Sequence, residues 1–255
     1  HAQYFRDHFE SAVDDWLRLP EAAWRALFLP EVDNVRAALE WSLGTGGDTA
    51  LAVALAGASG PVWTTLSLYG EGAQRIEAAA ARIQPDTSKA DQARLSFWLA
   101  AVLEEAMPAR ALAAFEQSIS LYRELHDSLG LAHSRMRQAR VLIKMGRFES
   151  AAAALADVHG VESAGLPRLL GVYFANVGYL KVTTGNPASA RAHMEKAALF
   201  FREAGMETAE HVMHGALADV TWVLGDLAAG LSIPVDSDME SLDEYLTQQG
   251  WRPPF

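Results

Sequence analysis

Residues 174–197 read FANVGYLKVTTGNPASARAHMEKA, two apolar runs of helical period on either side of Gly185. This pattern predicts two helices joined by a tight turn. Gly178 in the first run and Ala190 in the second are small, so the two helices can approach closely there. Met194 is large and lies four residues after Ala190. We expect it to pack against the neighbouring pair of helices.

The same pattern recurs along the chain with a period near 40 residues. Glycines that end a long apolar run stand at 146, 185 and 225, at spacings of 39 and 40 residues. Small residues recur at a matching interval, at Ala73, Ala111, Ala151, Ala190 and Gly230. One helical hairpin cannot bury its apolar faces alone, so neighbouring hairpins are expected to stack. The repeat therefore predicts an all-α solenoid of helical hairpins.

Residues 174–197 resemble a tetratricopeptide repeat, because their aromatic, Gly, Gly, Ala, large and Ala residues follow the order and spacing of that family. The other copies match less fully. The period near 40 exceeds the usual period of about 34 residues, which implies longer helices. The resemblance implies a right-handed solenoid in which the first helix of each hairpin lines a concave groove.

Helical periodicity covers nearly the whole chain, and no run alternates as a strand would. The predicted helices are 2–19, 21–28, 31–43, 48–59, 62–68, 71–83, 89–106, 109–126, 128–145, 148–158, 167–184, 187–204, 207–224, 227–231 and 237–249. Pro30 and Pro187 are expected at first helical positions, where the missing N–H costs no hydrogen bond. We expect an N-terminal capping bundle over 1–85, tetratricopeptide-like repeats over 86–235, and a capping helix and tail over 236–255.

A second resemblance covers about 85 residues at the N-terminus. Residues 1–5, Ala23-Trp24 and residues 31–43 look like a stretch of large bacterial STAND-type ATPase regulators. In that group a DNA-binding domain, often winged-helix, and the ATPase precede helical repeats. Because the chain starts with His1 and not Met, and the first predicted helix begins at residue 2, we expect a fragment or a processed protein. The resemblance implies an intramolecular contact with an absent ATPase domain.

Composition excludes several kinds of chemistry. A net charge of −11 argues against direct nucleic-acid binding, which needs a clustered basic surface. The absence of Cys excludes disulfides, thiolate nucleophiles and Cys zinc sites. Residues 44–49 are Gly-rich but lack the Lys-Ser or Lys-Thr of a P-loop. The acidic pairs Asp14-Asp15 and Glu104-Glu105 are expected on solvated faces. We therefore expect neither an enzyme nor a bound cofactor.

Residues 49–70 carry no charge over 22 positions, long enough to span a bilayer. Gly60-Pro61 would break such a helix, so a buried pair of short helices is expected instead. No signal peptide is visible, and a cytoplasmic protein with no membrane association is expected.

Metal binding is considered for Glu207, His211 and His214, which share one face of a predicted helix. No fourth ligand has an obvious position, so no metal site is expected.

Tryptophan is frequent in the first 100 residues, at Trp16, Trp24, Trp41, Trp63 and Trp98. Two interpretations remain open. These side chains can pack in the core of a repeat cap, or some of them can line an aromatic ligand pocket.

The repeat register also places a partner site. Positions lining the concave groove in tetratricopeptide repeats correspond here to His133, Met136, Arg140, Ile143, Lys144, Ala175, Tyr179, Val182, Thr183, Gly215, Asp219, Trp222 and Val223. We expect a protein or a small effector to bind there. Arg140, Tyr179 and Trp222 are the expected hot spots, because Arg and aromatic residues often dominate binding energy. The alternative is that Tyr179 and Trp222 pack between neighbouring hairpins.

These expectations favour a sensor or scaffold module of a bacterial transcriptional regulator. The regulator is implied by the resemblance, not by composition. The alternative is a repeat module appended to a signalling enzyme such as a nucleotide cyclase or a kinase. A stand-alone enzyme is the remaining hypothesis, and it would need a concave pocket with converging titratable groups.

Overall fold

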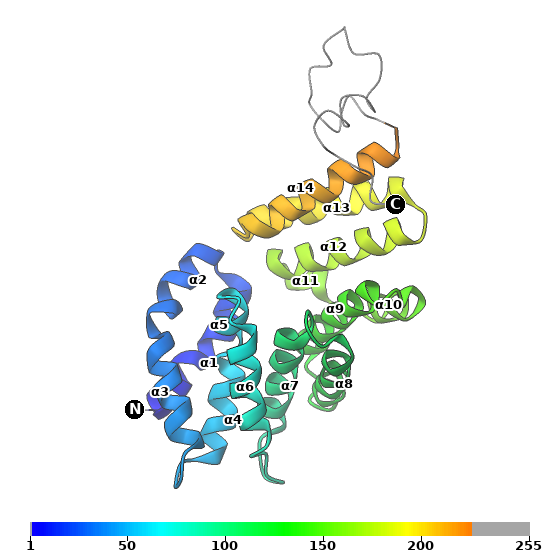
Figure 1. Cartoon of the computed structure of the whole chain (residues 1–255). Coiled ribbons are helices and arrows are strands. Elements are labelled where there is room, and N and C mark those ends of the chain that lie inside the picture. The colour runs from blue at the N-terminus through cyan, green and yellow to red at the C-terminus, as the bar shows by residue number, and fades with distance from the viewer. Residues whose placement is uncertain (1, 226–255) are drawn as a thin grey trace.

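The computed structural model describes residues 2–225, and helices are the only regular secondary structure in that range (Figure 1). Helical residues make up 81% of this part of the chain. The predicted all-α class is confirmed. The helices predicted at 227–231 and 237–249, and with them the C-terminal cap at 236–255, lie outside the described residues.

The first part of the chain contains α1 (Ala2–Arg18), α2 (Glu21–Phe28), the 3-10 turn η1 (Leu29–Glu31), α3 (Val32–Leu43), α4 (Thr49–Ala58), α5 (Gly60–Thr65) and α6 (Tyr69–Ala80). The second part contains α7 (Lys89–Leu103), α8 (Pro108–Glu124), α9 (Ser128–Lys144), α10 (Phe148–Ala156), α11 (Val161–Ala164), α12 (Pro167–Thr183), α13 (Pro187–Glu203) and α14 (Glu207–Val223). Each helix predicted within residues 2–225 is present, and its ends differ from the prediction by three residues or fewer.

Two local features differ from the prediction. Pro30 does not begin an α-helix but lies in η1, where the N–H of Val32 donates to the carbonyl of Leu29 and joins α2 to α3. The helix α11 was not expected, because four residues are too few to show a helical period. Gly160 and Gly165 bound it with φ of 79° and 61°, a left-handed conformation that favours glycine.

The helix α4 is the centre of the N-terminal part. Its residues from Ala52 to Ala58 are all buried, and α1, α3, α6 and α7 pack around it. A helix that is apolar on every side belongs in a core. The chain leaves α4 at Ser59, and α5 begins at Gly60, so the predicted pair of short helices is confirmed. Within the described residues, no helix combines the length and the apolar character that crossing a bilayer requires.

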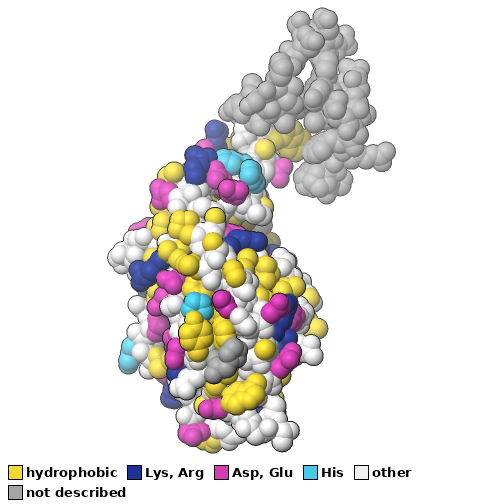
Figure 2. Space-filling view, turned by 90° about the vertical axis from the view of Figure 1, so that its left-hand side faces the viewer, with side chains coloured by type: hydrophobic (Ala, Val, Ile, Leu, Met, Phe, Trp, Pro, Cys, Tyr) yellow, Lys and Arg dark blue, Asp and Glu magenta, His cyan; other side chains and the backbone are white. Residues whose placement is uncertain are grey.

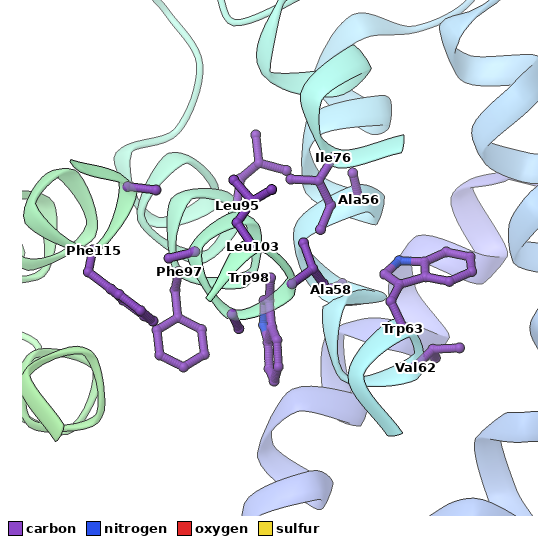
Figure 3. Close-up of a cluster of buried hydrophobic side chains, with 14 of the residues drawn as sticks. Ala56, Ala58, Val62, Trp63, Ile76, Leu95, Phe97, Trp98, Leu103 and Phe115 are labelled. Carbon is purple, nitrogen blue, oxygen red and sulfur yellow. The ribbon is translucent and has the colours of Figure 1, made fainter. Parts of the chain in front are cut away.

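One hydrophobic core joins this N-terminal part to α7 and α8. Figure 3 shows Trp63 of α5 and Ile76 of α6 on one side of α7, and Phe115 of α8 on the other. A Cβ atom added at Gly60 would lie 2.0 Å from the ring of Trp98, so this indole packs directly on the backbone between α4 and α5. Only glycine permits that approach.

In the second part, consecutive helices pack against each other from α7 to α10 and from α12 to α14 (Figure 1). Gly146, Gly185 and Gly225 have φ of 71°, 76° and 75°, as expected for residues that end a helix in the left-handed conformation. A Cβ atom at Gly178 would lie 2.7 Å from Cγ of Met194 and 3.5 Å from the carbonyl oxygen of Ala190. The close approach predicted between α12 and α13 is therefore present.

Replacing Ala190 by Leu should destabilise the protein. Ala190 is 0% exposed and faces Gly178, so three added carbons would be overpacked. Overpacking costs about 1–3 kcal/mol, which corresponds to a decrease in Tm of roughly 3–10 °C for a chain of this size. Thermal denaturation measures the change. The matched control is Ala192→Leu, at an exposed position of the same helix. Equal Tm values for the two variants would show that the register is wrong.

Candidate functional site

A cavity of about 320 Å³ lies between the C-terminal half of α1, the helix α7 and the turn from α8 to α9. Five rings line it, those of Trp16, Phe97, Trp98, Tyr122 and His133. Its polar side chains are Glu10, Asp14, Arg94 and Asp127. We refer to this cavity as the aromatic pocket. Its volume is at the lower end of the range for sites that bind small ligands.

Local sequence explains how the pocket forms. Gly130 lies in the first turn of α9, and a Cβ atom there would lie 2.6 Å from the ring of Tyr122. The absent side chain leaves room for this ring against the backbone. Asp127 caps the same helix, because its Oδ1 accepts the N–H of Gly130 at 2.8 Å. Phe97 and Trp98 are adjacent on α7 and both are buried, so α7 contributes two rings to one wall.

The rings contact one another at right angles and in stacked pairs. Trp16 meets Trp98 edge to face with 5.5 Å between centroids, and it stacks on His133 at 6.0 Å. Phe97 lies 4.4 Å from His133. Such geometries are the favourable ones for aromatic side chains. Trp16 therefore connects α1 to both α7 and α9.

Two residues that line the pocket each carry a buried donor without an acceptor. Trp98 is 3% exposed, and its Nε1 has no hydrogen-bond partner among the described residues. The same holds for Nη1 of Arg94, although Nη2 of Arg94 contacts Oε1 of Glu10 at 3.1 Å. Nε1 of Trp63 in the core is in the same state. All three atoms are shielded by surrounding protein, so they are not available to a molecule in the pocket.

His133 is neutral in this environment. Burial lowers its pKa to about 3, and the positive charges of Arg137 and Arg168 act in the same direction. A neutral imidazole can donate a hydrogen bond from one nitrogen and accept one at the other. Burial also raises the pKa of Tyr122, so its phenol keeps its proton. Both groups therefore offer uncharged polar atoms at physiological pH.

Arg168 lies against the outer side of this cluster. Its guanidinium carbon is 4.3 Å from the ring centroid of Trp16, a cation–π contact. The side chain is 2% exposed, and its Nε and Nη2 have no hydrogen-bond partner in the described part of the chain. Burial lowers its pKa to about 10, while the charge of Glu21 opposes the shift. An arginine in an apolar stretch of α12 thus reaches the N-terminal helices.

Some of the tryptophans pack in the core and others line the pocket, so each of the two interpretations applies to part of the set. Trp24 and Trp63 are fully buried in the core, and Nε1 of Trp24 donates to the carbonyl of Ala12 at 2.8 Å. Trp16 and Trp98 line the aromatic pocket. Trp41 fits neither interpretation because it is 60% exposed. It belongs to α3. Figure 2 shows the side of the molecule formed by the N-terminal helices, where hydrophobic and charged side chains are intermixed.

Three residues predicted to line an open groove are instead buried. Met136 is 0% exposed, Ala175 is 6% exposed and His133 is 9% exposed. The reason is that α1 packs on this end of the face, where Leu17 joins the same cluster as Met136 and Trp16 stacks on His133. His133 still lines a cavity, but that cavity is the aromatic pocket.

Arg140 and Lys144 carry ion pairs to the end of α7. Arg140 lies 3.8 Å from Glu104 and 3.4 Å from Glu105, and Lys144 pairs with Glu105. Glu104 is 5% exposed and lies 3.0 Å from Nη2 of Arg137, so the expectation of a solvated face was wrong for this residue. The helix α9 passes directly over Glu104, a contact that sequence spacing does not show.

The rest of the predicted groove lies on α12 and α14. Tyr179 and Trp222 are half-buried, while Thr183 and Asp219 are exposed. Burial raises the pKa of Tyr179, with smaller effects in opposite directions from the charges of Arg140 and Asp219. Their role as a partner site stays a prediction.

The residues considered for metal binding do not converge. No cluster of three potential His, Asp or Glu ligands occurs between residues 2 and 225. His211 is exposed, and His214 lies 3.5 Å from Glu210, which also pairs with Arg202 at 2.6 Å. The charges on this face of α14 are therefore used in surface ion pairs.

Sequence reasoning missed Arg168, Phe97, Tyr122 and the pocket carboxylates. Arg168 gave one usable signal, since it is followed by Leu169 and Leu170 in a strongly apolar helix, where an arginine needs a specific contact. Prediction of the other pocket residues would have required knowledge of which helices contact each other.

Comparison with known proteins adds no relative, because no protein-family model and no curated protein matches the chain.

Stability should fall as the pH falls below about 6.5. His133 has a folded-state pKa of about 3 and an ordinary unfolded value near 6.5, so the unfolded chain binds the extra proton first. The loss is at most about 1.4 kcal/mol per pH unit between these values. Urea denaturation at pH 7.5 and pH 5 measures it.

His133→Phe keeps a ring in the pocket and should remove this part of the pH dependence. The matched control His211→Phe changes an exposed histidine and should retain it. Identical pH profiles for both variants would contradict the buried neutral imidazole.

Proposed function

We propose that the chain is an effector-binding helical-repeat module, the sensor part of a bacterial transcriptional regulator. The observation that carries the proposal is the aromatic pocket, a cavity of about 320 Å³ lined by five rings and four charged side chains. A concave, mostly apolar pocket with a few polar groups is the usual form of a small-molecule site. The regulator rests on the resemblance of the N-terminal residues.

The repeat architecture forms part of this proposal. A right-handed tetratricopeptide-like solenoid is supported by the turn glycines and by the close crossing of Gly178 over Ala190. Successive hairpins also contact each other, since Nδ2 of Asn176 donates to the carbonyl of Met136 at 2.8 Å, which joins α12 to α9. The N-terminal helices then serve as the cap of the solenoid.

The position of α1 suggests how binding is transmitted. Glu10, Asp14 and Trp16 of α1 line the pocket, and Trp16 also contacts Arg168 of α12. A ligand therefore touches a helix that is shared between the bundle and the repeats. Ligand binding shifts the arrangement of α1 if the ligand prefers one arrangement over another. A change in the angle between α1 and α12 would reach any domain that contacts the N-terminal bundle.

A thermal-shift screen tests the pocket as the binding site. The library contains neutral, anionic and cationic compounds in equal numbers. A compound present at 100 times its Kd adds about 2.7 kcal/mol, which raises Tm by roughly 5–10 °C. Ala90→Trp places a large ring at a position that lines the pocket. We expect hits to stabilise the wild type and not this variant.

The matched control for the screen is Ala113→Trp, at an exposed position of α8 outside the pocket. Hits should stabilise this control as they do the wild type. If no compound of any charge class separates the wild type from Ala90→Trp, the pocket is not a ligand site and the proposal fails.

A further inference from the structure

We infer that the aromatic pocket binds an organic cation, in which an ammonium group is attached to a flat apolar body. This inference rests on the proposed function and names the ligand class of the same site. Two features support it: the aromatic lining of the cavity and the charges at its rim.

The rings favour a cation because the face of an aromatic ring carries partial negative charge. Tyr122, Phe97, Trp98 and Trp16 enclose the cavity from α8, α7 and α1. His133 completes the wall as a neutral ring, since burial and two nearby arginines suppress its protonation. It therefore adds no positive charge that would repel the ligand. Cages of several aromatic rings are a common way to bind alkylated ammonium groups.

The rim of the pocket is acidic. Three carboxylates, Glu10, Asp14 and Asp127, face one guanidinium, that of Arg94. Glu10 neutralises Arg94 at 3.1 Å, and Asp127 caps α9 through the N–H of Gly130. Asp14 is exposed and has no partner among the described residues. One carboxylate is thus free for a ligand cation.

The charges also orient the ligand. Arg168 lies 4.3 Å from the ring of Trp16, so a second cation close to that arginine would be repelled. The ammonium group is therefore expected at the rim beside Asp14, with the apolar body between the rings.

Three probes of nearly equal shape test the charge preference. They are benzyltrimethylammonium, its neutral isostere neopentylbenzene, and the anion phenylmethanesulfonate. Binding to the intact chain is measured by NMR titration at low ionic strength and again at high salt. We expect the cation to bind at least tenfold more tightly than the other two, and its affinity to fall with salt because the rim carboxylate is exposed.

Variants locate the interaction. Asp14→Asn should weaken binding of the cation by about three- to tenfold and leave the neutral probe unchanged. The matched control Asp86→Asn changes an exposed carboxylate that does not line the pocket and should have no effect. Neither substitution removes a contact between described residues, so both chains are expected to fold.

Three results would overturn the inference: equal or tighter binding of the neutral or anionic probe, an unchanged preference in Asp14→Asn, or no binding of any probe at millimolar concentration. Each outcome is distinct from failure of the proposed function. The thermal-shift screen covers all charge classes, so anionic or neutral hits that Ala90→Trp abolishes would retain the pocket as an effector site with a different ligand class.

Discussion

The contacts of one side chain, Trp16, tie α1 to three later helices. Its ring meets Trp98 of α7 edge to face, stacks on His133 of α9 and lies under the guanidinium of Arg168 of α12. Three helices that are distant in sequence therefore contact a single indole. The pocket, the neutrality of His133 and the burial of Arg168 all depend on this placement.

Local patterns in the sequence were sufficient for the helices. The apolar period and the glycines at 146, 185 and 225 predicted the helices and their ends, because a left-handed residue after a helix is a local requirement. The close approach of Gly178 to Ala190 also followed, since small residues at a regular interval imply crossing helices. Pro30 was misplaced, because a single 3-10 turn between two helices has no period that a sequence can reveal.

The candidate site was only partly predictable. His133 was selected by repeat spacing, and Trp16 and Trp98 were considered as pocket residues, so three of the five rings were named. The sequence could not predict that these rings contact one another. The repeat register describes contacts between neighbouring hairpins, whereas here α1 packs back onto α9 and α12. The same long-range packing buried Met136. The burial of Glu104 was not predicted for a similar reason, since its partner Arg137 lies one hairpin further along the chain.

The turn between α1 and α2 also reaches the far end of the described repeats. The N–H of Glu21 donates to the carbonyl of Ala204 at 3.3 Å, and a Cβ atom at Gly205 would lie 3.2 Å from Pro20. The turns that follow α1 and α13 thus meet, in addition to the contact between Trp16 and Arg168. If the pocket binds a ligand as we propose and this contact responds to it, thermodynamic linkage makes the coupling reciprocal. A partner that separates Pro20 from Gly205 would then change the affinity of the pocket by the same factor by which a pocket ligand changes the affinity for that partner.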